Sequence, residues 1–246
     1  MVQTGPTGAG RGFPDEAERV EPPDPAMIDA LVDRLAPLTR MVAESPLSLS
    51  SVTERGEAEK VHLRDSLSAL GVDQVRSAET VVDIGSGAGY PGIPLAMALP
   101  EADFTLVDSV GKKARFAGEA AEALGLTNAE ALGVRSEELA AGEGRERFDL
   151  ALARAVAPLS VLAELASPLL SEGGTLIAWK GEREPEEERR VEALAGQLAM
   201  EPRGVLAVVP FEGSRERHLY LLGKSGPTPA ELPRRPGMAR KRPLPE

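Results

Sequence analysis

The residues with the clearest potential for chemistry lie in a glycine-rich turn at positions 83–92. Glycines stand at 85, 87 and 89, directly after a short run rich in β-branched apolar residues. This pattern predicts a buried strand, a tight turn and the start of a helix. Glycine lets the backbone approach a ligand closely, and in an open α/β sheet such a turn lies at the carboxyl edge of the strand, where ligands bind.

The spacing of the glycines distinguishes between classes of ligand. A dinucleotide site has the pattern Gly-x-Gly-x-x-Gly, which would place its third glycine at position 90, where this chain has Tyr90. Asp83, two residues before the first glycine, would repel a pyrophosphate but would attract a ligand that carries an ammonium and a sulfonium group and no phosphate. These residues therefore predict S-adenosylmethionine as the cofactor, and they disfavour a nicotinamide-dependent dehydrogenase.

A second carboxylate, Asp108, strengthens this interpretation. It ends the next apolar run, residues 104–107, at a position that suits hydrogen bonds to two ribose hydroxyls. A glycine-rich turn alone is also explained by close packing, so the two carboxylates carry the argument. We expect cofactor contacts from both carboxylates and from the turn, at Asp83, Gly85, Ser86, Gly87, Gly89 and Asp108.

Composition limits the remaining chemistry. The chain has 246 residues, enough for one α/β domain and a small appendage, and a formal net charge of −11. It has no cysteine, which excludes disulfides, thiolate metal sites and a cysteine nucleophile. With two histidines we expect no metal site. Because nothing resembles a signal peptide or a membrane span, we expect a cytoplasmic protein without a membrane partner. We also expect a monomer, although neither the residues nor their spacing gives the oligomeric state.

The pattern divides the chain into four parts. Residues 1–25 are rich in Gly, Pro and acidic residues and predict a disordered leader. Residues 26–77 have apolar residues at helical spacing and predict a small amino-terminal helical subdomain. Residues 78–224 alternate strand and helix, which is typical of a mainly parallel sheet. Residues 225–246 form a basic, proline-rich tail that, counted from Lys224, carries six positive and two negative residues and predicts contact with phosphate.

The alternating region predicts an α/β fold with a seven-stranded, doubly wound sheet. The expected strands cover residues 80–84, 103–107, 128–132, 148–153, 175–179, 205–209 and 218–222. The link between the last two strands is too short for a helical crossover, so we expect them to form an antiparallel hairpin. Seven strands that end in such a hairpin describe the Rossmann-like sheet of class I methyltransferases.

Residues 83–95 resemble the signature of the glucose-inhibited division protein B family, the small-subunit (16S) ribosomal RNA guanine-N7 methyltransferases. Five further blocks are similar to the same family, at residues 106–116, 153–159, 180–181, 217–219 and 233–237. The double-proline block and the Asp-Ser-x-Gly-Lys block are the most selective. In the first helical segment the family usually has a Trp-Asn pair and an Asn-Leu-Thr stretch, whereas residues 47–50 read Leu-Ser-Leu-Ser.

The resemblance implies an S-adenosylmethionine-dependent enzyme that methylates N7 of a guanine in small-subunit ribosomal RNA, either free or in the 30S particle. It implies cofactor contacts at Gly85, Tyr90, Asp108, Ser109, Ser136, Glu137 and Arg154. Because N7 carries a free lone pair at neutral pH, no general base is needed, and catalysis would depend on in-line positioning and on the exclusion of water.

Cations near the target base are the expected complement to RNA. Arg154 and Lys180 end the fourth and fifth strands, close to where the base should enter, and are the candidate catalytic residues. Three further cations stand at the start of a predicted helix, where the helix dipole disfavours positive charge, so a functional role is favoured. The full set of expected RNA contacts is Lys112, Lys113, Arg115, Lys180, Arg217, His218, Arg234 and Arg235.

Two alternatives remain open on these residues. One is a class I methyltransferase that acts on a small molecule or a protein. The other is a catalytically silent scaffold that keeps the cofactor fold in order to bind RNA. Composition and spacing alone lead to a cofactor-dependent methyltransferase, while the nucleic acid, the guanine and the N7 atom come from the resemblance.

Overall fold

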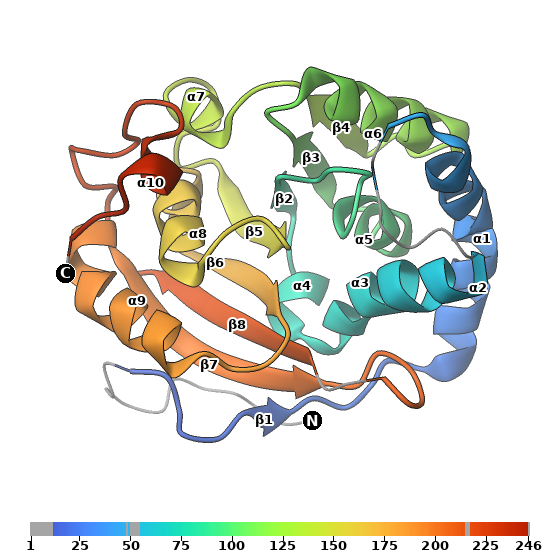
Figure 1. Ribbon diagram of the computed structural model, residues 1–246, viewed down its shortest axis with the longest axis horizontal. Coiled ribbons are helices and arrows are strands. Elements are labelled where there is room, and N and C mark those ends of the chain that lie inside the picture. The colour runs from blue at the N-terminus through green and yellow to red at the C-terminus, as the bar shows by residue number, and fades with distance from the viewer. Residues whose placement is uncertain (1–11, 48, 50–54, 215–216, 246) are drawn as a thin grey trace.

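The computed structural model describes residues 12–47, 49, 55–214 and 217–245. Within these residues the chain forms an eight-stranded sheet in the order β1-β7-β8-β6-β5-β2-β3-β4. The strands are β1 (Glu18–Arg19), β2 (Thr80–Ile84), β3 (Asp103–Val107), β4 (Ala129–Leu132), β5 (Phe148–Arg154), β6 (Leu170–Lys180), β7 (Met200–Val208) and β8 (Arg217–Lys224). Only β8 runs antiparallel to its neighbours, β6 and β7 (Figure 1).

Helices cover both faces of this sheet. They are α1 (Pro25–Glu44), α2 (Arg55–Ala58), α3 (Asp65–Leu67), α4 (Asp73–Arg76), α5 (Gly92–Ala98), α6 (Gly111–Ala123), α7 (Ser136–Ala140), α8 (Leu159–Ala166), α9 (Pro185–Leu198) and α10 (Met238–Lys241). A π-helical turn, η1 (Glu59–Arg64), joins α2 to α3, and a 3-10 turn, η2 (Ser68–Gly71), follows α3.

Alternate residues of the central strands supply two separate hydrophobic cores. Val81 belongs to a core that also contains buried residues of α1, α5 and α6, whereas Val82 belongs to one that contains buried residues of α7, α8 and α9. Successive side chains of a strand point to opposite faces, so the β-branched run of β2 serves both cores. The amino-terminal helices therefore share the core of one face of the sheet with α5 and α6.

All seven expected strands are present, and the antiparallel pairing of the last two is confirmed. Strand β6 begins at Leu170, five residues before the expected start at 175. The run of glutamates after Pro185 forms the first turn of α9, where negative charge complements the helix dipole.

The prediction of a disordered leader is wrong for residues 12–25. Glu18 and Arg19 pair in parallel with Leu206 and Ala207 of β7 and add an eighth strand at the edge of the sheet (Figure 1). Phe13 packs edge-on against Tyr220 at 5.3 Å between ring centroids. The few apolar residues of this segment thus dock on a surface that other parts of the chain build. Residues 1–11 lie outside the described residues.

The carboxyl-terminal segment is docked on the domain, and its expected contact with phosphate stays a prediction. Lys224 is 1% exposed, and its Nζ donates to the Ser167 carbonyl at 2.6 Å and to Thr228 Oγ1 at 2.8 Å. Leu232 and Ala239 are buried with residues of α8, and α10 lies beside α8 in Figure 1. The apolar residues between the cations dock this segment on the domain.

Candidate functional site

The glycine-rich turn connects β2 to α5 at the carboxyl edge of the sheet. Gly85, Gly87 and Gly89 have φ angles of 73°, 57° and 91°, which glycine adopts without the steric cost that other residues carry. The amides of Gly85 and Ser86 both donate to the Val107 carbonyl, at 2.7 and 3.0 Å. The turn is therefore fixed against the end of β3, as the sequence pattern predicts.

Asp108 is held by the turn that follows β2. Its Oδ2 accepts the Gly87 amide at 3.0 Å, and its Oδ1 accepts the Val110 amide at 2.8 Å. The residue is 7% exposed, and it lines a cavity of about 300 Å³. Because each carboxylate oxygen already accepts one backbone amide, the group keeps a fixed orientation with lone pairs left for a ligand.

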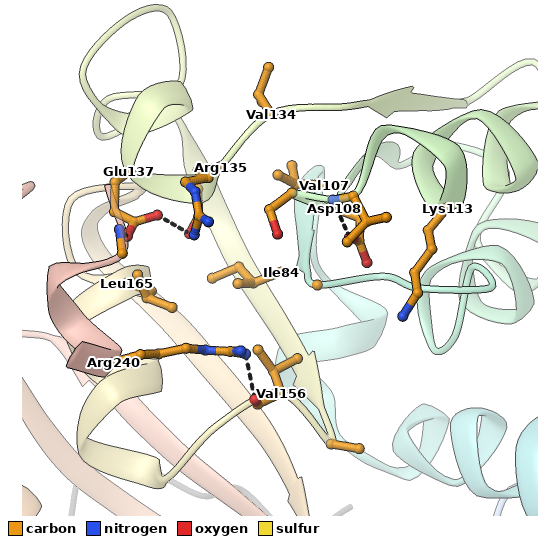
Figure 2. Close-up of a pocket in the computed structure, with 16 residues that line it drawn as sticks. Ile84, Val107, Asp108, Lys113, Val134, Arg135, Glu137, Val156, Leu165 and Arg240 are labelled. Atoms are coloured by element: carbon orange, nitrogen blue, oxygen red, sulfur yellow. Dashed lines mark hydrogen bonds between the residues drawn. The ribbon is translucent and has the colours of Figure 1, made fainter. Parts of the chain in front are cut away.

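The cavity lies at the carboxyl ends of β2 and β3, beside α7 and α8. Its lining combines apolar side chains with about as many polar and charged ones, and is formed by Ile84, Gly85, Val107, Asp108, Ser109, Val110, Lys113, Val134, Arg135, Ser136, Glu137, Ala155, Val156, Leu165, Gly237 and Arg240. Figure 2 shows Glu137 and Arg240 on one side of this cavity and Asp108 and Lys113 on the other. The cavity thus offers several converging polar groups beside apolar surface, which suits a polar small molecule.

Beneath the turn, buried polar atoms lack partners. Among the described residues, Asp83 Oδ1, Ser86 Oγ and the Tyr90 hydroxyl have no hydrogen-bond partner. Asp83 is 1% exposed, and its other oxygen accepts the Gly92 amide at 2.9 Å. Burial raises the pKa of Asp83 to about 7, against the opposing effects of that hydrogen bond and of Arg154. Buried groups of this kind have hydrogen-bonding capacity available for a ligand.

Arg154 lies at the end of β5, but its guanidinium is already bound. Nη1 donates to Asp65 Oδ2 at 3.1 Å and to the His62 carbonyl at 3.2 Å, and the group sits 5.2 Å from the centroid of the Tyr90 ring. The His62 ring stacks on the Tyr90 ring, with 5.0 Å between their centroids, and its Nδ1 lies 3.5 Å from Arg154 Nη2. Burial, and secondly Arg154, lowers the pKa of His62 to about 4, so this histidine is neutral at physiological pH.

Several of the other predicted RNA contacts are also engaged within the protein. Lys180 Nζ lies 2.6 Å from Glu187 Oε2. His218 is 8% exposed and its Nδ1 lies 2.6 Å from the Gly181 carbonyl oxygen. Arg217 Nε lies 3.6 Å from Asp65 Oδ1, and Arg234 makes a two-pronged ion pair with Glu164. In this conformation the side chain of Arg234 is directed into the protein, whereas Arg235 is exposed.

The three cations at the start of α6 separate into two environments. Lys113 lines the cavity together with Asp108. Lys112 and Arg115 are exposed and border a second hollow, of about 490 Å³, whose apolar part includes Met41, Leu47 and Phe116. The turn of the helix thus directs neighbouring cations to different sites, because residues one apart on a helix do not share a face.

The structure adds residues that sequence reasoning did not assign. Arg135, Val156, Gly237 and Arg240 line the cavity, and Asp65 joins the Arg154 cluster. The block at 233–237 contains Gly237, but a sequence block does not indicate which other segment its residues contact. Ala155, with a φ of 57°, marks a strained turn directly after Arg154.

None of the helices in the described part of the chain has both the length and the hydropathy that a membrane span requires. The same residues contain no cluster of His, Cys, Asp or Glu side chains arranged to hold a metal ion.

The sheet order, the terminal antiparallel strand and the glycine turn at the carboxyl edge define a Rossmann-like class I methyltransferase. Solved structures share this fold. Cofactor-bound Rv0187 from MTB has a TM-score of 0.54 at 18% identity, covering 84% of this chain and all of that one. MtNAS in complex with MTA and tNA has a TM-score of 0.51 at 17% identity, covering 81% of this chain and 73% of that one.

Sequence relatives identify the family. The family described as rRNA small subunit methyltransferase G matches residues 35–220, and this chain belongs to it. The ribosomal RNA small subunit methyltransferase G of Rubrobacter xylanophilus is 45% identical over 74% of this chain and 72% of the relative. The protein of the same name from Deinococcus deserti is 39% identical over 87% of this chain and 89% of the relative.

Proposed function

We propose that this protein uses S-adenosylmethionine to methylate N7 of a guanine in small-subunit ribosomal RNA. The observation that carries the proposal is the cavity at the carboxyl edge of the sheet, where Asp108 is fixed by the Gly87 amide. The family to which the chain belongs supports the ribosomal RNA substrate, and the guanine and its N7 atom rest on the resemblance of residues 83–95.

The residues around the cavity fit the chemistry of this cofactor. Asp108 and the adjacent Ser109 offer acceptors for ribose hydroxyls, and Ile84, Val134 and Leu165 offer apolar surface for an adenine ring. Glu137, with Ser136, offers a carboxylate to the adenine amino group. Asp83 and Ser86 hold buried polar atoms without partners on the side of the turn, where an amino-acid moiety with an ammonium group would satisfy them.

When bound, S-adenosylmethionine supplies a methyl group that a sulfonium already activates. Guanine N7 needs no proton removed, so the protein has only to orient the base and to exclude water. The residues beside the turn suit these two tasks. Tyr90 is buried, and Arg154 contacts His62, which is neutral, and Asp65, with which it forms an ion pair. A general base is not part of the proposal.

Arg154 and Lys180 have the role of positioning residues in this proposal. Both end strands at the edge where the base would enter, and both are held by carboxylates, Asp65 and Glu187. Arg154 joins the η1–α3 segment to the ring of Tyr90 and so fixes the wall beside the turn. Exposed Lys112, Arg115 and Arg235 are the proposed contacts to RNA phosphate.

The test compares classes of substrate. The purified protein is incubated with labelled S-adenosylmethionine and with 30S subunits, free 16S RNA, a protein mixture or small-molecule amines. Transfer to ribosomal RNA alone is the expected result. Transfer to small molecules or protein would favour a different class I methyltransferase, and cofactor binding by calorimetry without any transfer would identify a silent scaffold.

A further inference from the structure

The carboxyl-terminal segment, residues 225–245, is fixed beside the cavity by side chains of three helices. Glu164 of α8 accepts Arg234 Nε at 2.7 Å and Nη2 at 2.6 Å. Arg190 of α9 donates to the Leu244 carbonyl at 2.7 Å. Buried Leu232 and Ala239 pack into the core of the same face. The segment is therefore a docked part of the domain.

The third helix places this segment on a residue of the cavity itself. The Gly237 amide donates to Glu137 Oε1 at 2.7 Å, and Glu137, in α7, is 8% exposed and lines the cavity. A buried carboxylate needs donors to compensate for lost water, and the left-handed backbone of Gly237, with a φ of 81°, favours glycine. A segment that only covered the core would need no such contact.

Arg240 extends the contact along the cavity. Its side chain lines the space opposite Asp108, and its Nη2 donates to the Val156 carbonyl at 2.5 Å (Figure 2). Val156 follows the strained turn at Ala155 and lines the same cavity. Arg240 thus joins the carboxyl-terminal segment to the β5–α8 loop across the mouth of the site.

We propose that residues 237–240 form a wall of the cofactor site and are cofactor-binding residues. The Gly237 amide orients Glu137 through Oε1. Oε2 accepts the Ser136 hydroxyl at 3.4 Å and keeps a lone pair for the adenine amino group, while Arg240 closes the side opposite Asp108. This inference rests on the proposed use of S-adenosylmethionine. Because coupling between two binding events is reciprocal, an intact wall strengthens cofactor binding and bound cofactor strengthens the docking of the wall.

The first test measures the affinity of the full-length protein for S-adenosylmethionine by calorimetry, without RNA. Arg240→Ala removes one group from the wall and should weaken binding about tenfold, the equivalent of one lost polar contact. Lys241→Ala removes the same charge from the adjacent, exposed position and should change the affinity less than about twofold.

The two failures are distinguishable. If the unaltered protein does not bind S-adenosylmethionine, both the proposed function and the cofactor-binding role of residues 237–240 are contradicted. If the unaltered protein binds and Arg240→Ala binds equally well, only the wall is contradicted.

The second test detects the reciprocal effect. Hydrogen exchange of a peptide that spans residues 232–244, which contains the Gly237 amide, is compared with and without S-adenosylmethionine. The wall predicts slower exchange in this peptide and no comparable change in α9. Equal exchange in both conditions would mean that the segment is a structural cover without contact to the cofactor.

Discussion

We expect Asp83 to make cofactor binding depend on pH in a defined direction. Burial raises the pKa of its carboxyl to about 7, so in the ligand-free protein the group gains its charge as the pH rises through neutrality. A cationic ligand prefers the charged form. We expect the affinity for S-adenosylmethionine to increase between pH 6 and 8, and Asp83→Asn to weaken binding and to remove most of this dependence.

Calorimetry across this pH range checks the prediction, with Asp103→Asn as the control at the exposed start of β3.

The carboxyl of Asp83 also affects the stability of the fold, with the opposite pH dependence. In the unfolded chain Asp83 ionises near pH 4, so its contribution to the free energy of unfolding declines from about pH 4 to 7 in the ligand-free protein. A pH-independent affinity in the unaltered protein would contradict the role of Asp83.

A substitution at Gly87 tests whether the glycine-rich turn binds the cofactor. A Cβ added at Gly87 would meet only the Gly85 carbonyl oxygen, at 3.9 Å. The side chain of Gly87→Val should therefore occupy open space that the ligand needs. The substitution also strains the backbone, because φ at this position is 57°. Gly125→Val carries the same backbone strain, with a φ of 71° and no atom within 4 Å, but lies after α6. We expect loss of cofactor binding in the first variant only. Retained binding in Gly87→Val would refute the assignment of the turn.

The pair of Asp65 and Arg154 is a buried link between η1–α3 and β5. Burial raises the pKa of Asp65, and the nearby Arg154 and Arg217 oppose this shift. These opposing effects are typical of a desolvated ion pair. Asp65→Asn leaves Arg154 without its charge partner and should lower the free energy of unfolding by about 3 kcal/mol. Trp179, the one tryptophan of the chain, donates to the Asp65 carbonyl, so its fluorescence reports denaturant unfolding at this place.

Asp73→Asn is the matched control for this variant, because its partner Arg76 is half exposed. Surface pairs of this kind contribute little, so a change below about 0.5 kcal/mol is expected. Equal effects of the two variants would show that the Arg154 cluster does not hold the segment.

At the scale of elements, α6 offers a test of RNA contact that does not disturb the cofactor. Lys113 lines the cavity, whereas Lys112 and Arg115 face away from it. Replacing Lys112 and Arg115 with alanine should reduce methylation of ribosomal RNA. It should also make the salt dependence of RNA binding weaker, so that the magnitude of the slope of log affinity for RNA against log salt decreases by about two. Cofactor affinity should be unchanged.

A second double variant provides the control. Arg34→Ala with Arg40→Ala removes two exposed cations from α1 and should leave the salt slope within error. If the α6 variant loses cofactor affinity instead, the division of its cations between two sites is wrong.

The elements that sequence predicts well are those whose residues carry their own pattern. The β2 run and the turn after it are fixed by alternating burial and by glycine, both visible locally. β1 is not visible in this way, because two residues become a strand only when β7 offers them an edge. Docking of the segment after β8 likewise depends on Glu164 and Glu137, far away in sequence.

The same distinction applies to the site. Asp108 follows an apolar run, so its place at the sheet edge is predictable, and its contact with Gly87 follows from the fold. Arg154 is correctly placed at the end of β5, but its partner Asp65 lies 89 residues earlier. The sequence predicts which cations stand at the functional edge, and tertiary contacts decide which of them face solvent.

At the scale of the whole molecule, the proposed function needs two surfaces, the cavity at the sheet edge and the exposed cations of α6. The cavity lies between β2, β3 and α7 and is lined by Lys113 of α6 and Arg240 of α10, whereas the exposed Lys112 and Arg115 of α6 border the second hollow. The formal net charge of −11 does not oppose RNA binding if these cations are concentrated around the site, because local potential governs the approach of a polyanion.

The most direct measurement of the central claim is the identity of the modified nucleotide. Small ribosomal subunits from cells with and without this protein are digested and their RNA is analysed by mass spectrometry, with Gly87→Val as the inactive form. The account predicts one 7-methylguanosine in the small-subunit RNA that disappears without the protein and is not restored by this variant. An unchanged 7-methylguanosine content, or a lost methyl group on another atom, would contradict it.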